Sequence, residues 1–199
     1  MNSDPRITCD PASSPPIALQ EKTALRKALL ADRRALPEAT RGSWDAAIAQ
    51  RLLDWCANEN IAELAVYWPL HGEPDLQAAY AELAARGVAL SLPVVLEKQA
   101  PLAFARWTPG EPMVRDGMGV AVPATLRLIA APATLLVPCL GFNLQRYRLG
   151  YGGGYYDRTL EHAPRPLTLG IAYGCLQAEF ASGPYDIALD HIVTEGNLF

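Results

Sequence analysis

A predicted strand, a glycine-rich loop and a predicted helix follow one another over residues 135–160, and this order constrains the fold more than any other feature of the sequence. Residues 135–138 form an apolar run that is typical of a buried strand. The segment RLGYGGGYYD stands at 148–157, and we expect a helix over about 153–162. Glycines let backbone N–H groups approach a phosphate closely, and open α/β sheets bind ligands beyond the carboxyl ends of their strands. The order therefore predicts an anion-binding loop on an α/β fold.

This loop differs from the two best-known phosphate-binding loops. No Gly-Lys-Ser/Thr follows it, which excludes a Walker A loop, and Tyr155 stands where a GxGxxG motif would have its third glycine. A tight turn without a ligand would also explain a cluster of glycines. Arg146 and Arg148 favour the phosphate interpretation, because guanidinium groups match the geometry of phosphate oxygens.

Strands and helices alternate along the rest of the chain. Helices are predicted over 17–36, 37–55, 76–86 and 153–162. Strands are predicted over 63–68, 88–95, 102–107, 135–138 and 167–173, and mostly loop over 108–125. This alternation predicts a three-layer α/β fold with a central, mostly parallel sheet and helices on both faces. We expect a single domain over 17–199, preceded by a disordered, proline-rich tail over 1–16.

The helix expected over 17–36 carries a stripe of leucines and, beside it, a basic stripe made of Lys22, Arg26 and Arg33. A basic stripe is often only a solvated face. Cations at the edge of a packed face can also point into a cleft that holds an anion. Spacing alone leaves both interpretations open.

The composition excludes several classes of protein. A formal net charge of -4 argues against a broad nucleic-acid-binding surface. No apolar run approaches about 20 residues, so we expect no membrane span, and the polar N-terminus does not resemble a signal peptide. The four cysteines are far apart and form no metal-ligand motif, which favours free thiols in a reducing compartment. We therefore expect a cytoplasmic protein that acts on small molecules.

VPCLGF stands at 137–142 and RLGYGGGYYD at 148–157, which together follow the pattern VPxxxF and then RLGxGxGYYD. This pattern resembles the main signature of a known family, that of 5-formyltetrahydrofolate cyclo-ligase. The other matching segments are the helix with Lys22, Leu25, Arg26 and Arg33, the stretch YWPLHGE at 67–73, and a C-terminal pattern made of Asp186, Asp190, Thr194 and Glu195. The resemblance spans nearly the whole chain after the tail.

The resemblance implies an activity. Enzymes of this family convert 5-formyltetrahydrofolate to 5,10-methenyltetrahydrofolate while they hydrolyse MgATP to ADP and phosphate. The formamide oxygen attacks the γ-phosphate, and N10 then closes on the activated carbon. Phosphorylation turns a poor leaving group into a good one, so catalysis should consist mostly of positioning and charge neutralisation.

The functional residues of the family carry over to particular positions of this chain. The implied ATP-binding residues are Lys22, Arg26, Arg148, Leu149, Gly150, Tyr151, Gly152, Gly153, Gly154, Tyr155 and Tyr156, of which Lys22 and Arg148 are the implied catalytic cations. The implied Mg²⁺ ligands are Asp157 and Asp186, and the implied folate-binding residues are Trp68, Glu73 and Tyr155.

Some of these side chains have simpler explanations. Asp157 at a helix start would offset the helix dipole, and Asp186 would suit a turn. Glu73 could be a solvated loop acid. Trp107 could either stack on the folate or belong to the core.

Three positions depart from the family pattern. Val122 stands where an acid often precedes the proline, Leu76 where threonine is common, and Asn143 where aspartate is usual. The missing acid bears on the fit of the folate and not on the phosphate loop.

Two other functions remain as alternatives. One is a family member that binds nucleotide or folate without cyclising it, against which the intact Lys22, Arg148 and Asp157 argue. The other is an acyl-CoA or sugar-phosphate enzyme on a similar α/β fold, which would not explain the basic helix.

Overall fold

The computed structural model describes residues 17–199, and the tail expected over 1–16 lies outside the described residues. The helices are α1 (Ile17–Ala35), α2 (Glu38–Asn58), α3 (Gln77–Ala85), α4 (Tyr155–Leu160) and the 3₁₀ turn η1 (Gly174–Leu176). The strands are β1 (Glu63–Ala65), β2 (Ala89–Val94), β3 (Ala103–Arg106), β4 (Met113–Arg115), β5 (Ala121–Pro123), β6 (Leu128–Ile129), β7 (Thr134–Pro138), β8 (Gly141–Phe142), β9 (Arg148–Leu149), β10 (Leu167–Ile171) and β11 (His191–Val193). Within residues 17–199, none of the helices combines the length and apolar character needed to cross a membrane.

Seven strands form the central sheet, in the order β11-β10-β7-β1-β2-β3-β6. The pairs β11–β10, β10–β7, β7–β1 and β1–β2 are parallel, whereas β2–β3 and β3–β6 are antiparallel. The sheet is therefore mostly parallel, as the alternation of strands and helices predicted. Because the parallel strands point the same way, their carboxyl ends meet at one edge of the sheet.

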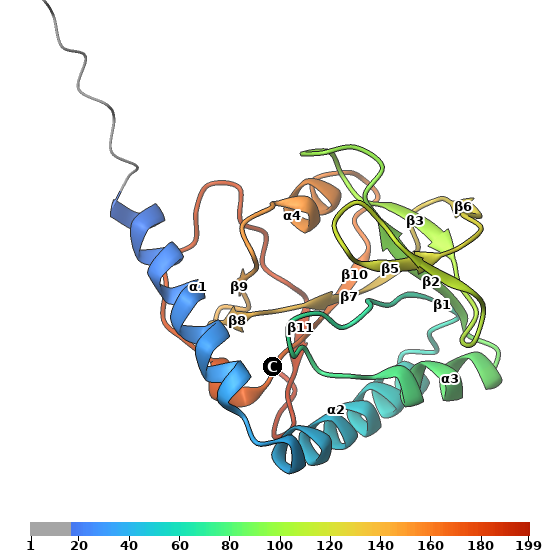
Figure 1. Cartoon of the computed structure of the whole chain (residues 1–199), viewed down its shortest axis with the longest axis horizontal. Coiled ribbons are helices and arrows are strands. Elements are labelled where there is room, and N and C mark those ends of the chain that lie inside the picture. Colours follow the sequence, from blue (N-terminus) through green and yellow to red (C-terminus); the bar gives the residue numbers. More distant parts are fainter. Residues whose placement is uncertain (1–16) are drawn as a thin grey trace, which may run out of the picture.

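The sheet is buried on both faces. Successive side chains of β7 point to opposite faces, so Leu136 joins the core formed with α2 and α3, while Leu135 and Val137 join a second core formed with Leu160 of α4. These β7 side chains are at most 1% exposed, and burying each one stabilises the fold by about 1.5–3 kcal/mol. Figure 1 shows α2 and α3 along one side of the sheet and α4 on the other. The three-layer architecture is thus confirmed.

Residues 108–125 are mostly loop, as predicted, but they also contain the short hairpin of β4 and β5, which the sequence did not predict. The carboxylate of Asp116 accepts hydrogen bonds from the N–H groups of Met118 and Val120 at 2.8 and 2.9 Å, and Gly119 has a positive φ. These residues build a tight turn. The glycines and prolines that predicted a loop therefore form the turn of this hairpin and flank its strands. The strands β6, β8, β9 and β11 were also unpredicted, because segments of two or three residues carry no periodicity.

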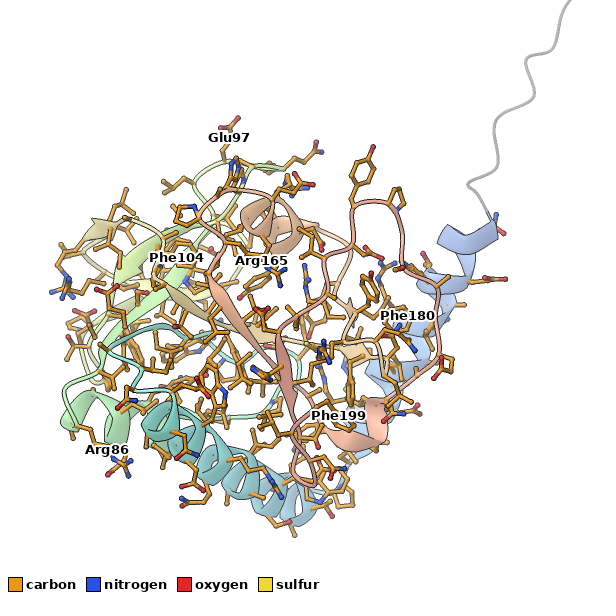
Figure 2. All side chains as sticks on the ribbon, turned by 180° about the vertical axis from the view of Figure 1, so that it is seen from behind. Arg86, Glu97, Phe104, Arg165, Phe180 and Phe199 are labelled. Carbon is orange, nitrogen blue, oxygen red and sulfur yellow. The ribbon has the colours of Figure 1, made fainter. Side chains whose placement is uncertain are left out.

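The chain after β10 returns along α1 and then enters the sheet as β11. Figure 2 shows Phe180 of this returning segment beside α1. The ring centroid of Phe180 lies 5.9 Å from Nζ of Lys22. Near the C-terminus, the ring of Phe199 packs 5.4 Å from that of Phe142. The first helix and the segment that follows β10 are thereby brought into contact.

Candidate active site

A cavity of about 710 Å³ opens beyond the carboxyl ends of β1, β2 and β7. Trp68 follows β1, Pro93 lies near the end of β2, and Pro138 ends β7. Open α/β sheets bind their ligands at this edge. The lining includes every residue that the resemblance assigned to a ligand, namely Lys22, Arg26, Trp68, Glu73, all of residues 148–157, and Asp186.

The glycine loop, residues 150–154, connects β9 to α4. Its backbone follows a path that requires glycine at two positions. Gly152 and Gly154 have φ values of +92° and +66°, in the left-handed region that other residues rarely adopt. A Cβ on Gly154 would also lie 2.8 Å from Nη1 of Arg158. Because α4 has only six residues, we expect loop N–H groups and nearby guanidinium groups, rather than a helix dipole, to attract an anion.

Two arginines hold this loop through its carbonyl groups. Nε of Arg26 in α1 donates to the carbonyl of Gly150 at 2.8 Å, and Nη2 of Arg158 in α4 donates to the carbonyl of Gly153 at 2.6 Å. The Arg158 guanidinium also lies 5.2 Å from the ring centroid of Tyr155. The basic stripe of α1 therefore faces the loop, so the interpretation of this stripe as a solvated face is wrong.

Each carboxylate that the sequence suggested as a metal ligand is paired with a cation. Nζ of Lys22 lies 2.5 Å from Oδ2 of Asp186, and Nη2 of Arg148 lies 2.5 Å from Oδ1 of Asp157. The Arg148 side chain is 5% exposed, and its Nη1 donates to the carbonyl of Ile187 at 3.0 Å. The two pairs line the same cavity as the glycine loop, so two positive and two negative groups face this cavity.

Asp186 is held in its ionised form. Burial alone would raise the pKa of Asp186, but hydrogen bonds from the Gly183 N–H and from Lys22, and the charge of Arg148, hold this pKa below its usual value. Within residues 17–199, no three His, Cys, Asp or Glu side chains gather in a way that could hold a metal ion by themselves. A pair of carboxylates still fits Mg²⁺, which usually binds one or two carboxylates together with water and phosphate oxygens.

A hydrogen-bond network connects α1, the glycine loop and the segment after β1. The hydroxyl of Tyr151 donates to Oε1 of Glu73 at 2.8 Å and accepts a hydrogen bond from Nη2 of Arg33. Oε2 of Glu73 accepts a hydrogen bond from the Leu70 N–H at 2.9 Å. Burial raises the pKa of Glu73, while these hydrogen bonds and the charge of Arg33 oppose the rise. Glu73 is only 5% exposed, so the interpretation as a solvated loop acid is wrong.

The two tryptophans near the cavity have different roles. Trp68 is partly exposed and lines the cavity. Trp107 is 3% exposed and packs edge to face against Trp68 and Tyr80, with ring centroids 6.2 Å apart in both cases. Trp107 therefore belongs to the core, which decides between the two roles that the sequence left open.

The departures from the family pattern lie outside the cavity lining. Val122 and Leu76 are buried core residues. The side-chain oxygen of Asn143 accepts hydrogen bonds from two backbone N–H groups in the following turn, and its nitrogen donates to the carbonyl of Phe180 at 3.2 Å. An aspartate could make the first two hydrogen bonds but not the third.

Two acids of the C-terminal pattern stabilise the fold. Oδ2 of Asp190 accepts hydrogen bonds from the N–H and hydroxyl of Thr168 at 2.8 and 2.7 Å. Oε2 of Glu195 accepts one from the Gly174 N–H at 2.8 Å. In contrast to Asp186, neither residue lines the cavity.

Sequence reasoning missed part of the cavity lining. The added residues are mostly apolar and include Pro93, Val95, Leu102, Met118, Val120 and Tyr185. They come from separate segments and form no motif, so only tertiary structure brings them together. Arg158 was also missed, although its position four residues after Gly154 placed a cation one helical turn from the loop.

Comparison with known proteins finds relatives over nearly the whole chain. The family model of the 5-formyltetrahydrofolate cyclo-ligase family matches residues 18–195. A 5-formyltetrahydrofolate cyclo-ligase from Mycolicibacterium smegmatis is 32% identical over 187 residues, covering 88% of this chain and 94% of that protein. Another, from Mycoplasma pneumoniae, is 30% identical over 179 residues, covering 88% of this chain and 99% of that protein.

Solved structures show the same similarity. A 5,10-methenyltetrahydrofolate synthetase from Mycoplasma pneumoniae superposes with a TM-score of 0.75 at 27% identity, covering 88% of this chain and 99% of that chain. The NMR structure of the Aquifex aeolicus 5,10-methenyltetrahydrofolate synthetase gives a TM-score of 0.77 at 29% identity, covering 89% of this chain and 91% of that chain. The shared fold therefore extends over nearly all of the described residues.

Proposed function

The chain belongs to the 5-formyltetrahydrofolate cyclo-ligase family, and we propose that it uses ATP and Mg²⁺ to cyclise 5-formyltetrahydrofolate to 5,10-methenyltetrahydrofolate, with release of ADP and phosphate. It is an enzyme of the ligase class. The observation that carries the proposal is that the glycine loop, the cations of α1 and Glu73 line one cavity. A family member that binds without cyclising is not favoured, because all the implied functional side chains are present there.

The proposed reaction has a clear chemical requirement. The formyl oxygen attacks the γ-phosphorus of ATP, and the bond between this phosphorus and ADP breaks. N10 then adds to the activated formyl carbon and loses its proton to solvent, and the oxygen leaves with the phosphate. The protein performs little covalent chemistry in such a reaction, so its residues act by positioning the two substrates and by neutralising charge.

The triphosphate is the most highly charged part of the substrates, and the cavity offers four cations for it. These are Lys22, Arg26, Arg148 and Arg158. Lys22 and Arg148 are paired with carboxylates. We expect the bound triphosphate to compete for these two cations, and Arg148 to neutralise charge on the transferring phosphoryl group.

Asp157 and Asp186 are the side chains that would hold Mg²⁺. When bound, the ion supplies positive charge between these carboxylates and the phosphate oxygens, which would otherwise repel each other. Asp186 suits this role because its lowered pKa keeps it ionised. Asp157 suits it because it follows the glycine loop directly and lines the cavity.

Glu73, Trp68 and Tyr155 are the proposed folate contacts. A carboxylate can accept paired hydrogen bonds from the N–H edge of a pterin. Each oxygen of Glu73 already accepts one hydrogen bond, and a carboxylate oxygen can accept two. The Trp68 and Tyr155 rings line the same cavity and offer flat surfaces to the folate.

We propose the cytoplasm as the site of this activity. Cys56 and Cys139 are free and buried, and burial raises the pKa of each thiol to about 12. Such thiols are unreactive and suit a reducing compartment. The proposed partners are the two small-molecule substrates, with no nucleic acid and no membrane.

Turnover of the purified protein tests the proposal directly. The protein is mixed with ATP, Mg²⁺ and 5-formyltetrahydrofolate, and the absorbance of methenyltetrahydrofolate and the amount of ADP are followed together. We expect both products in equal amounts. Binding of both substrates without methenyltetrahydrofolate would favour the non-cyclising alternative, and ADP release independent of folate would indicate a different substrate.

A further inference from the structure

The side chain of Tyr151 leaves the glycine loop and reaches the Glu73 carboxylate. Its backbone lies between Gly150, whose carbonyl is held by Arg26, and Gly152, which has a φ of +92°. Its hydroxyl donates to Oε1 of Glu73 at 2.8 Å. Tyr151 is therefore part of the proposed nucleotide loop through its backbone and part of the proposed folate contact through its side chain.

Arg33 of α1 is the second partner of the Tyr151 hydroxyl, besides Glu73. The residue is fully buried, and its Nη2 donates to the hydroxyl of Tyr151. Nε of Arg33 donates to the carbonyl of His71 at 3.2 Å, while Nη1 has no hydrogen-bond partner among the described residues. A buried cation requires a compensating anion, and Tyr151 links Arg33 to Glu73. The state of Glu73 thus depends on where the loop holds the Tyr151 hydroxyl.

Occupation of the loop should therefore affect the Glu73 carboxylate. A phosphate bound by the N–H groups of the loop would restrict the loop backbone, and this would hold the Tyr151 hydroxyl in the position against Oε1 of Glu73 that it has in this structure. If the loop moves, Glu73 loses one of its two hydrogen bonds and its link to Arg33. A buried carboxylate that has lost a donor is a weaker partner for a ligand, because it is less stable in its charged form.

We propose that Tyr151 is a positioning residue that couples the two substrate sites, so that nucleotide in the glycine loop raises the affinity of the cavity for folate. Coupling between binding sites is reciprocal, so folate raises the affinity for nucleotide by the same factor. This inference rests on the proposed function, since it assigns the loop to ATP and Glu73 to folate. It adds a specific side chain through which one substrate prepares the site for the other.

Tyr151→Phe tests the coupling, because it removes only the hydroxyl. The dissociation constant of 5-formyltetrahydrofolate is measured by calorimetry with and without a non-hydrolysable ATP analogue, and the reverse titration is also made. In the parent we expect the analogue to tighten folate binding at least about fivefold, the low end of typical coupling. In the variant this factor should fall toward one, while the affinity for the analogue alone changes by less than about twofold.

In turnover, KM for folate should rise about tenfold, as expected for a lost charge-assisted hydrogen bond, with little change in kcat.

Tyr147→Phe is the matched control. Tyr147 lies in the preceding turn outside the cavity lining, and its hydroxyl makes no hydrogen bond to the described residues. Its removal should leave the coupling factor unchanged. A coupling factor that is the same in Tyr151→Phe and in the parent would overturn the inference. The inference would also be overturned if Tyr151→Phe weakened folate binding and nucleotide binding equally, and to the same extent with and without the other ligand. Absence of turnover in the parent would instead count against the proposed function, so the two failures are distinguishable.

Discussion

Nζ of Lys22 lies 2.5 Å from Oδ2 of Asp186, although 164 residues separate these two positions in the sequence. The contact joins α1 to the segment that precedes β11. Both side chains are partly buried and both line the cavity. The site therefore depends on elements from the two ends of the domain, and disrupting this pair should affect both folding and substrate binding.

The acid sensitivity of folding should depend on Asp186. Its pKa in the folded protein lies below the usual 3.8, so the native state binds fewer protons here than the unfolded state does. Its contribution to stability is present above the unfolded pKa and is lost as the pH falls through the folded pKa. We expect Asp186→Asn to lower the melting temperature at neutral pH and to flatten its decline in acid. Melting curves from about pH 7 to about pH 3 check this. Asp54→Asn, an exposed carboxylate on α2, is the control, and an equal drop at every pH for Asp186→Asn would contradict the prediction.

Glu73→Gln should weaken folate binding without affecting nucleotide binding. The amide keeps the size of the side chain but replaces one acceptor oxygen with a donor, and the N–H of Leu70 and the hydroxyl of Tyr151 both need acceptors. We expect a loss of about 1.5–3 kcal/mol in folate binding, the usual contribution of a hydrogen bond to a charged group. Calorimetry with each substrate separately measures this. Glu161→Gln alters an exposed acid in the same cavity lining and should have little effect. Unchanged folate affinity in Glu73→Gln would show that Glu73 is not the pterin contact.

The sequence predicted the glycine loop and its place at the carboxyl edge of the sheet, because the signals for both are local. A buried strand that ends before a glycine cluster implies a loop at the carboxyl edge of a sheet, and the structure places 148–157 there. The partners of these residues could not be predicted. The Arg33–Tyr151 contact spans 118 residues, and nothing in the helical stripe distinguished a buried Arg33 from a solvated one. Trp107 was ambiguous for the same reason, since its burial depends on Tyr80 and Trp68.

Gly154→Ala should damage the loop more than a glycine substitution elsewhere. The φ of Gly154 is +66°, and an added Cβ would meet Nη1 of Arg158 at 2.8 Å. We expect a loss of about 1–2 kcal/mol in folding free energy from the left-handed backbone alone. We also expect a raised KM for ATP, because the arginine that holds the Gly153 carbonyl must move. Gly117→Ala, where a Cβ would have no neighbour within 4 Å, is the matched control for denaturant melts and ATP kinetics. Equal effects of the two substitutions would show that the loop tolerates a side chain at this position.

Asp157 and Arg148 should respond differently to Mg²⁺, although Oδ1 of Asp157 and Nη2 of Arg148 are only 2.5 Å apart. If Asp157 holds the ion, Asp157→Asn lowers turnover strongly and raises the Mg²⁺ concentration needed for half-maximal rate, because an amide is a weaker ligand for a hard cation. Arg148→Ala should lower turnover even at saturating Mg²⁺, because it removes a separate positive charge from the phosphoryl group. Loss of the ion pair is common to both variants, so a purely structural role would give both the same Mg²⁺ dependence. Initial rates over a range of Mg²⁺ concentrations separate these cases. If the Mg²⁺ midpoint of Asp157→Asn equals that of the parent, Asp157 is not a ligand of the metal.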